Sequence, residues 1–232
     1  LPLVYREEEL DDRICELLNL DIGPPDLTSW EEMVGRIKNP KDGRVRICVV
    51  GKYTELVDSY KSIAEALVHG GIEAGVGVDV DWWSSERVEE QGADFVERFH
   101  GVLVPGGFGV RGISGMLDTI RYIRENGIPY FGICLGLQCA IIEFARNVCG
   151  LKRSHSFEFD KKTPDPVISL LDSQRKVTEM GGTMRLGAYP CQLEKNSLAH
   201  EVYGVDEISE RHRHRYEVNP EYQNKEVKIQ YY

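Results

Sequence analysis

Continuous apolar runs alternate with amphipathic segments along residues 44–148. The apolar runs predict buried strands over residues 45–50, 76–83, 102–105 and 129–133. The segments between and after them predict helices over residues 59–69, 86–99, 113–126 and 135–148. Strand–helix alternation at this spacing is typical of a mostly parallel sheet covered by helices, and the shorter apolar pieces of 151–232 predict an antiparallel extension. The expected fold class is therefore α/β, with a mostly parallel central sheet flanked by helices and an antiparallel extension.

The first 42 residues have a different character. They contain eleven acidic against five basic residues. An amphipathic helix is predicted over 6–20, the Gly23-Pro24-Pro25 sequence interrupts it, and a second helix is predicted over 28–38. We interpret 1–42 as an interdomain linker or helical arm, and 43–232 as one domain.

Composition narrows the function classes. Apolar residues make up 41% and charged residues 28% of the chain, as in soluble globular proteins. The formal net charge of −10 argues against a nucleic-acid surface, and no apolar run predicts a membrane span. The N-terminus lacks a signal-peptide pattern, so we expect a cytoplasmic location. The six cysteines show no C-x-x-C pair and no zinc-ligand spacing, and Cys15 and Cys48 lie in apolar runs that predict buried thiols.

The strongest chemical motif is Gly132-Ile133-Cys134-Leu135-Gly136, which lies between a predicted strand and a predicted helix. It has the form of a nucleophile elbow with cysteine in place of serine. A tight, strained turn requires neighbours without side chains two residues to either side. The helix that follows is expected to lower the pKa of the Cys134 thiol, and the Leu135 amide is free to donate to an oxyanion. A structural turn with a buried cysteine is the alternative, and Cys139 is expected to have a packing role.

Two further stretches contain candidate binding groups. The loop "PGGFGVRG" (105–112) follows a predicted strand, and its backbone amides suit an anion or a developing oxyanion. A flexible turn is the alternative, and no G-x-x-x-x-G-K-[ST] motif supports a phosphate loop. The stretch "ERHRHRYEVN" (210–219) contains three arginines that suit a carboxylate, with a solvated charged strand as the alternative.

Taken together, these motifs resemble the class I (triad) glutamine amidotransferases. Five stretches narrow the resemblance to the amidotransferase domains of the CTP synthase family: "VGKYTELVDSYKSIAEAL" (50–67), "PGGFGVRG", "GICLGLQ" (132–138), "GGTMRLG" (181–187) and "RHRHRYEVN" (211–219).

The resemblance implies a role for each matching residue. Cys134 would attack the side-chain amide of L-glutamine and form a glutamyl thioester, releasing ammonia. The amides of Gly107 and Leu135 would form the oxyanion hole. Gln138 would lie against the substrate, Glu158 would bind its α-amino group, and Arg215 with Tyr216 its α-carboxylate. Phe108 and Arg185 would lie near the site of a GTP effector.

The resemblance also implies partners and cofactors. The ammonia would pass to a synthetase domain of the same polypeptide, which uses ATP and Mg²⁺ to aminate UTP to CTP. GTP would activate the glutaminase half, and the full enzyme would be a homo-tetramer. No cofactor or metal is expected in this domain itself, and no nucleic-acid or membrane partner.

The sequence departs from the family at the catalytic base. The family's catalytic His and Glu belong to an H-P-E motif after a late strand, and this sequence has no H-P-E after "KEVKIQYY". The stretches 171–181 and 219–225 are also shorter than in the family. We expect that loops and the C-terminal residues are missing from this sequence. An inactive homologue or non-catalytic regulatory domain is one alternative, and a γ-glutamyl hydrolase on the same fold is another.

Overall fold

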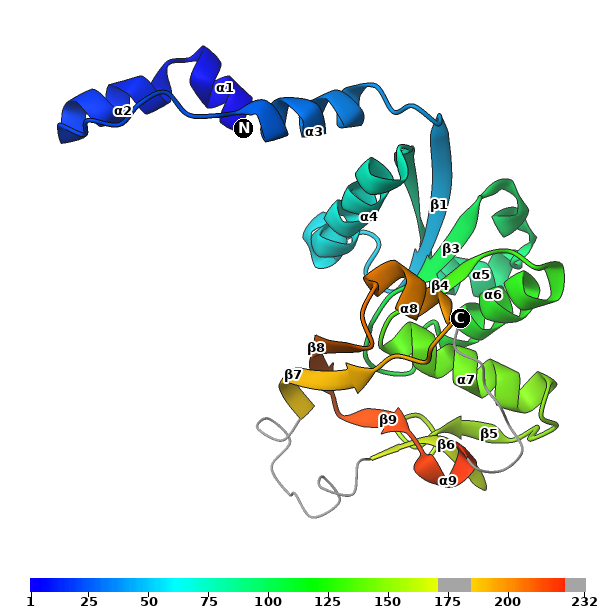
Figure 1. The fold of residues 1–232 in the computed structure, drawn as a ribbon. Coiled ribbons are helices and arrows are strands. Elements are labelled where there is room, and N and C mark those ends of the chain that lie inside the picture. Colours follow the sequence, from blue (N-terminus) through cyan, green and yellow to red (C-terminus); the bar gives the residue numbers. More distant parts are fainter. Residues whose placement is uncertain (171–184, 224–232) are drawn as a thin grey trace. The chain divides into compact units, whose positions relative to one another are not determined.

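The computed structural model describes residues 1–170 and 185–223 (Figure 1). Its central sheet has four strands in the order β2-β1-β3-β4. These strands are β1 (Arg44–Gly51), β2 (Gly77–Ser84), β3 (Gly101–Val104) and β4 (Tyr130–Gly132). β3 and β4 pair in parallel, with Val102 opposite Tyr130. The four strands match the four apolar runs, so the predicted fold class is confirmed.

The helices between the strands follow the predicted pattern with one exception. They are α4 (Lys61–Ala74), α5 (Ser85–Gln91), α6 (Ile113–Asn126) and α7 (Leu135–Asn147), with 3₁₀ turns η1 (Val57–Tyr60) and η2 (Asp94–Arg98). The single helix predicted over 86–99 is wrong: α5 ends before Gly92, whose φ of 84° is unfavourable for other residues. The apolar period continues past Gly92 because η2 buries Val96 on the same core.

The C-terminal part forms two smaller sheets. One has the order β5-β6-β9, and the other pairs β7 with β8. Their strands are β5 (Ser154–Ser156), β6 (Asp165–Leu170), β7 (Arg185–Gln192), β8 (Glu207–His214) and β9 (Tyr216–Val218), and α8 (Leu198–Tyr203) and α9 (Pro220–Gln223) complete the elements. β7–β8 and β6–β9 are antiparallel as predicted, whereas β5 pairs with β6 in parallel.

The chain divides into two compact units. The first contains Leu1–Ile47 and Leu56–Asp81, and the second contains Cys48–Glu55 and the residues from Trp82 onward. The first unit begins with α1 (Pro2–Glu7), α2 (Leu10–Leu18) and α3 (Thr28–Lys38), none of which contains a buried residue. The helix predicted over 6–20 is split at Glu9, whose φ is 53°. Cys15 is only half-buried, contrary to the prediction, and the boundary at 42/43 stays a prediction.

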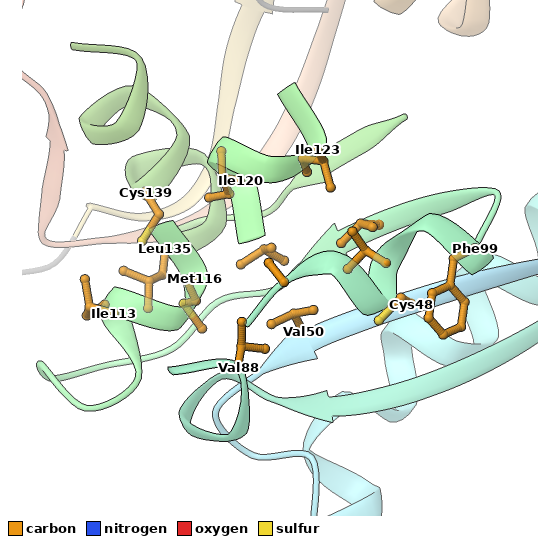
Figure 2. Packing of buried hydrophobic residues seen from close by; sticks show 14 residues of the cluster. Cys48, Val50, Val88, Phe99, Ile113, Met116, Ile120, Ile123, Leu135 and Cys139 are labelled. Atoms are coloured by element: carbon orange, nitrogen blue, oxygen red, sulfur yellow. The ribbon is translucent and has the colours of Figure 1, made fainter. Parts of the chain in front are cut away.

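The second unit has a continuous apolar core, part of which Figure 2 shows. Cys48 and Val50 of β1 pack there with Met116, Ile120 and Ile123 of α6. The core also contains Val88, Ala93, Val96, Phe99, Val102, Val104, Ile113, Leu135 and Cys139. A second cluster joins Ile141, Ile142 and Ala145 of α7 to Val167 and Ile168 of β6. α7 therefore packs on both clusters, and its first turn is fixed by the core.

Among the residues that the structure describes, no helix has the length and apolar character needed to cross a lipid bilayer.

Candidate active site

Cys134 lies at a strained turn between β4 and α7. It is the N-cap residue of α7, with φ 55° and ψ −106°. A non-glycine residue with positive φ is uncommon, and such strain persists only where the surrounding structure enforces it. Ser or Cys at the sharp strand-to-helix turn of a nucleophile elbow is held in this way, with its side chain presented at the edge of the sheet.

The two glycines that bracket Cys134 are required by close packing. A Cβ added at Gly136 would overlap the carbonyl oxygen of Val104 and lie 2.8 Å from its carbonyl carbon. A Cβ at Gly132 would lie 2.7 Å from the backbone nitrogen of Leu137. Both distances are shorter than real Cβ atoms tolerate. The first turn of α7 therefore rests directly on the backbone of β3, which holds the elbow in position.

The Gly106-Gly107 loop lies beside the cysteine. A Cβ at Gly106 would be 3.7 Å from the Cys134 sulfur, and one at Gly107 would be 3.2 Å from Cδ2 of Leu135. As the first residue of α7, Leu135 has an amide without an intrahelical acceptor. The structure therefore brings together the two backbone segments in which the sequence predicted an oxyanion hole.

Residues directly after β1 support this loop. The buried Lys52 ammonium donates to the carbonyl oxygens of Phe108, at 3.1 Å, and of Gly109. The Phe108 amide donates to the Tyr53 hydroxyl at 3.3 Å. Neither Lys52 nor Tyr53 was predicted from the sequence to have a role in the site. Their position after a strand of the central sheet was the available signal, because ligands of such sheets bind at the carboxyl ends of the strands.

A pocket of about 230 Å³ opens next to Cys134. Its lining includes Gly107, Phe108, Cys134, Gln138, Glu158, Arg213, His214, Arg215 and Tyr216. Glu158 comes from the segment after β5, Arg213 and His214 end β8, Arg215 connects the strands, and Tyr216 begins β9. One carboxylate and two guanidinium groups thus line the same pocket as the thiol, although they come from elements that are distant from it in the sequence.

Gln138 and Glu158 are held by the backbone. The Gln138 side-chain amide donates to the Tyr216 carbonyl oxygen at 2.8 Å, which ties α7 to β9. The Gly109 amide donates to Oε1 of Glu158 at 3.3 Å. Gln138 therefore positions Tyr216 as well as lining the pocket.

The electrostatic setting of Cys134 differs from the prediction. Burial raises the pKa of its thiol, the Leu135 amide lowers that pKa by less, and the Glu158 carboxylate raises it further. The expected net lowering by the helix N-terminus is wrong, because the pocket removes more solvent than one amide replaces. The resting group is therefore a thiol, and a base must remove its proton before it can act as a nucleophile.

Cys139 has the environment of a structural residue. It is fully buried in the core, and burial raises the pKa of its thiol to about 12. A thiol in such surroundings is unreactive. The prediction of a packing role for Cys139 is confirmed.

The two predicted effector residues come from different segments, the loop after β3 and strand β7. Phe108 lines the pocket and is exposed. Arg185 begins β7, paired with His214 of β8, and residues 181–184 of the "GGTMRLG" stretch lie outside the described residues. Within residues 1–170 and 185–223, His214 is the histidine that lines the pocket.

Comparisons with known proteins agree with this geometry. The family model described as glutamine amidotransferase class-I matches residues 55–232. A CTP synthase of Syntrophus aciditrophicus (strain SB) is 54% identical over 226 residues, covering 97% of this chain and 42% of that protein. A CTP synthase of Methanococcus maripaludis is 53% identical over 229 residues, covering 96% and 43%. The chain spans about two fifths of the length of these relatives.

One solved structure is also similar to this chain in fold and in sequence. The glutaminase domain of Trypanosoma brucei CTPS with bound acivicin is 39% identical in sequence, with a TM-score of 0.70. The match covers 77% of this chain and 69% of that chain. At this identity and coverage, the likeness extends beyond the sheet to most of the domain.

Proposed function

Because this chain belongs to the class I glutamine amidotransferase family, we propose that it hydrolyses L-glutamine through a thioester on Cys134 and supplies ammonia for CTP synthesis. The observation that supports this most directly is the positive φ of Cys134 at the start of α7, beside the Gly106-Gly107 loop. A structural cysteine gains nothing from that strain, whereas a nucleophile needs to stand at the strand edge.

The proposed reaction has two steps. The Cys134 sulfur attacks the side-chain carbonyl carbon of glutamine, and the amides of Gly107 and Leu135 stabilise the negative charge that develops on the carbonyl oxygen. The C–N bond breaks, the amide nitrogen leaves as ammonia with the proton that the Cys134 thiol has lost, and a glutamyl thioester remains. Water then attacks the thioester, releases glutamate and restores the thiol.

The pocket chemistry fits the charged end of an amino acid. Glutamine has an α-ammonium and an α-carboxylate group, which require one acidic and one basic partner. Glu158 is the acid of the pocket lining, and Arg215 is a base that suits a carboxylate by bidentate hydrogen bonding. Tyr216 stands beside Arg215 and is fixed through Gln138.

The fate of the ammonia follows from the relatives. Since the chain matches CTP synthases over nearly its whole length, we assign the ammonia to a synthetase domain of the same polypeptide, where ATP and Mg²⁺ support the amination of UTP. GTP activation and a tetrameric assembly complete the proposal. The base that takes the Cys134 proton in this family, the His of H-P-E, has no counterpart in these 232 residues.

Covalent labelling tests the nucleophile. We expect acivicin to modify Cys134 of the intact protein and glutamine to protect it, as mapped by peptide mass spectrometry. The exposed Cys191 is the internal control, because a merely accessible thiol would react without protection by glutamine. Labelling at Cys191 alone, or no labelling, would contradict the proposal and support a non-catalytic domain.

A second test concerns the coupling to CTP formation. In the intact enzyme, Cys134→Ala should abolish glutamine-dependent CTP formation and leave ammonia-dependent formation unchanged. If the variant retains glutamine-dependent formation, Cys134 is not the nucleophile.

A further inference from the structure

The structure places three metal-ligating side chains together at the edge of the pocket. His212 and His214 are two residues apart on β8, so both side chains project from one face of the strand. Glu217 follows on β9. One ligand atom from each residue lies within 4.8 Å of the others, and all three side chains are half-buried. We propose that His212, His214 and Glu217 bind a divalent transition-metal ion of the zinc type.

The spacing of the two imidazoles fits a shared ion. Their Nδ1 atoms are 3.3 Å apart. Two nitrogens bound to one tetrahedral zinc at about 2.0–2.1 Å lie roughly 3.3–3.4 Å from each other. Without an ion, the same two nitrogens form a hydrogen bond with one another at this separation. The two imidazole nitrogens therefore need almost no change in separation to share an ion, and a carboxylate oxygen of Glu217 lies within 4.8 Å of the histidine ligand atoms.

The ligand set suits this class of ion. Two imidazoles and one carboxylate are ligands that zinc prefers, and three protein ligands leave a fourth position for water. The Tyr189 ring meets the His212 ring edge-on at 5.5 Å between centroids, which limits rotation of that imidazole. Gly187 is the cross-strand partner of His212, so no side chain from that position competes for the space.

A metal ion bound by His212, His214 and Glu217 would alter the neighbouring pocket that contains Cys134. His214 lines the pocket with Cys134, and Arg215 and Tyr216 lie in the chain between the histidines and Glu217. A bound ion would fix this turn and hold His214 in the pocket wall. We expect slower glutamine hydrolysis when the ion is bound. This consequence rests on the proposed function and is measured separately from metal binding.

Zinc binding is measured directly in the intact, metal-free protein by competition with a chromophoric chelator. We expect one strong site in the wild type, and at least tenfold weaker binding in His212→Ala, His214→Ala and Glu217→Gln. His69→Ala is the matched control, because it removes an exposed histidine of α4 and should leave the affinity unchanged. Equal affinity of the wild type and the three site variants, or no strong site in the wild type, would overturn the proposal.

Two further measurements identify the ligands of the ion. Bound cobalt(II) should give a tetrahedral spectrum without a thiolate charge-transfer band, and a thiolate band would place the ion on a cysteine instead. Zinc should raise the unfolding temperature of the wild type, whereas Glu217→Gln, which keeps the shape of the side chain, should lose this increase. An equal increase in that variant would also contradict the site. Glutamine hydrolysis with and without zinc then tests the consequence, and an inactive protein would leave the binding result intact.

Discussion

Gly136→Ala should damage both the stability and the chemistry of the elbow, because the added methyl has no space. Its carbon would lie 2.8 Å from the carbonyl carbon of Val104 and 3.1 Å from Val104 Cβ. Carbon atoms pack best at about 3.5–4.0 Å, so β3 and the first turn of α7 must separate by roughly 1 Å. Overpacking of this kind costs about 1–3 kcal/mol of unfolding free energy.

The same displacement acts on the reaction. Gly136 is two residues from Cys134, and β3 leads directly into the Gly106-Gly107 loop, so the separation moves the sulfur away from the loop amides. A misplacement of about 1 Å can cost roughly 100-fold in rate. We therefore expect kcat/KM for glutamine hydrolysis to fall about 100-fold, measured as glutamate release in a coupled dehydrogenase assay.

Gly70→Ala provides a matched control with the same chemical change. Gly70 lies within α4, and a Cβ there would meet no atom within 4 Å. Replacing a helical glycine by alanine stabilises by about 0.5–1 kcal/mol. This variant should be slightly more stable and fully active. If Gly136→Ala unfolds at the temperature of the wild type and hydrolyses glutamine at the same rate, the elbow does not depend on close packing at Gly136.

Further predictions concern the ion pair, the thiol and the pocket. Glu143 of α7 is 2% exposed and binds the Arg124 guanidinium of α6 at 2.8–3.1 Å. Arg124→Ala should therefore lower the unfolding free energy, measured by urea denaturation, by about 3–5 kcal/mol. Loss of the exposed Arg13–Glu16 pair should lower it by under about 1 kcal/mol. Because burial raises the pKa of Cys134, its alkylation by iodoacetamide should still be accelerating above about pH 9, and a plateau below about pH 8 would refute the raised pKa. Arg215→Ala and Glu158→Gln should each raise KM for glutamine at least tenfold. Lys161→Ala, on the exposed loop after Glu158, is the control and should leave KM unchanged. Unchanged KM values in the first two variants would refute the proposed contacts of these residues with the α-carboxylate and α-ammonium groups of glutamine.

The local sequence determined the elements around the elbow. The continuous apolar runs of β1 and β3 and the 3.6-residue period of α6 each report burial by the residues' own chemistry, so their bounds follow from the chain. The glycines at 132 and 136 distinguish Cys134 from Cys139 in the sequence, since they bracket the first cysteine and not the second. The break at Gly92 was missed because a glycine inside a periodic apolar pattern does not reveal its own φ.

Only the tertiary structure decided the electrostatics and the partners of the site. The net effect on the Cys134 pKa depends on how much solvent the surrounding pocket removes, and the neighbouring residues in sequence do not contain that information. The support of the Gly106-Gly107 loop by Lys52, and the meeting of His212 and His214 with Glu217, arise from contacts between separate elements. The sequence by itself thus determined which cysteine stands at a strained turn, because that depends on adjacent residues. Solvation and long-range contacts depend on how the strands pair, and so they were settled by the fold.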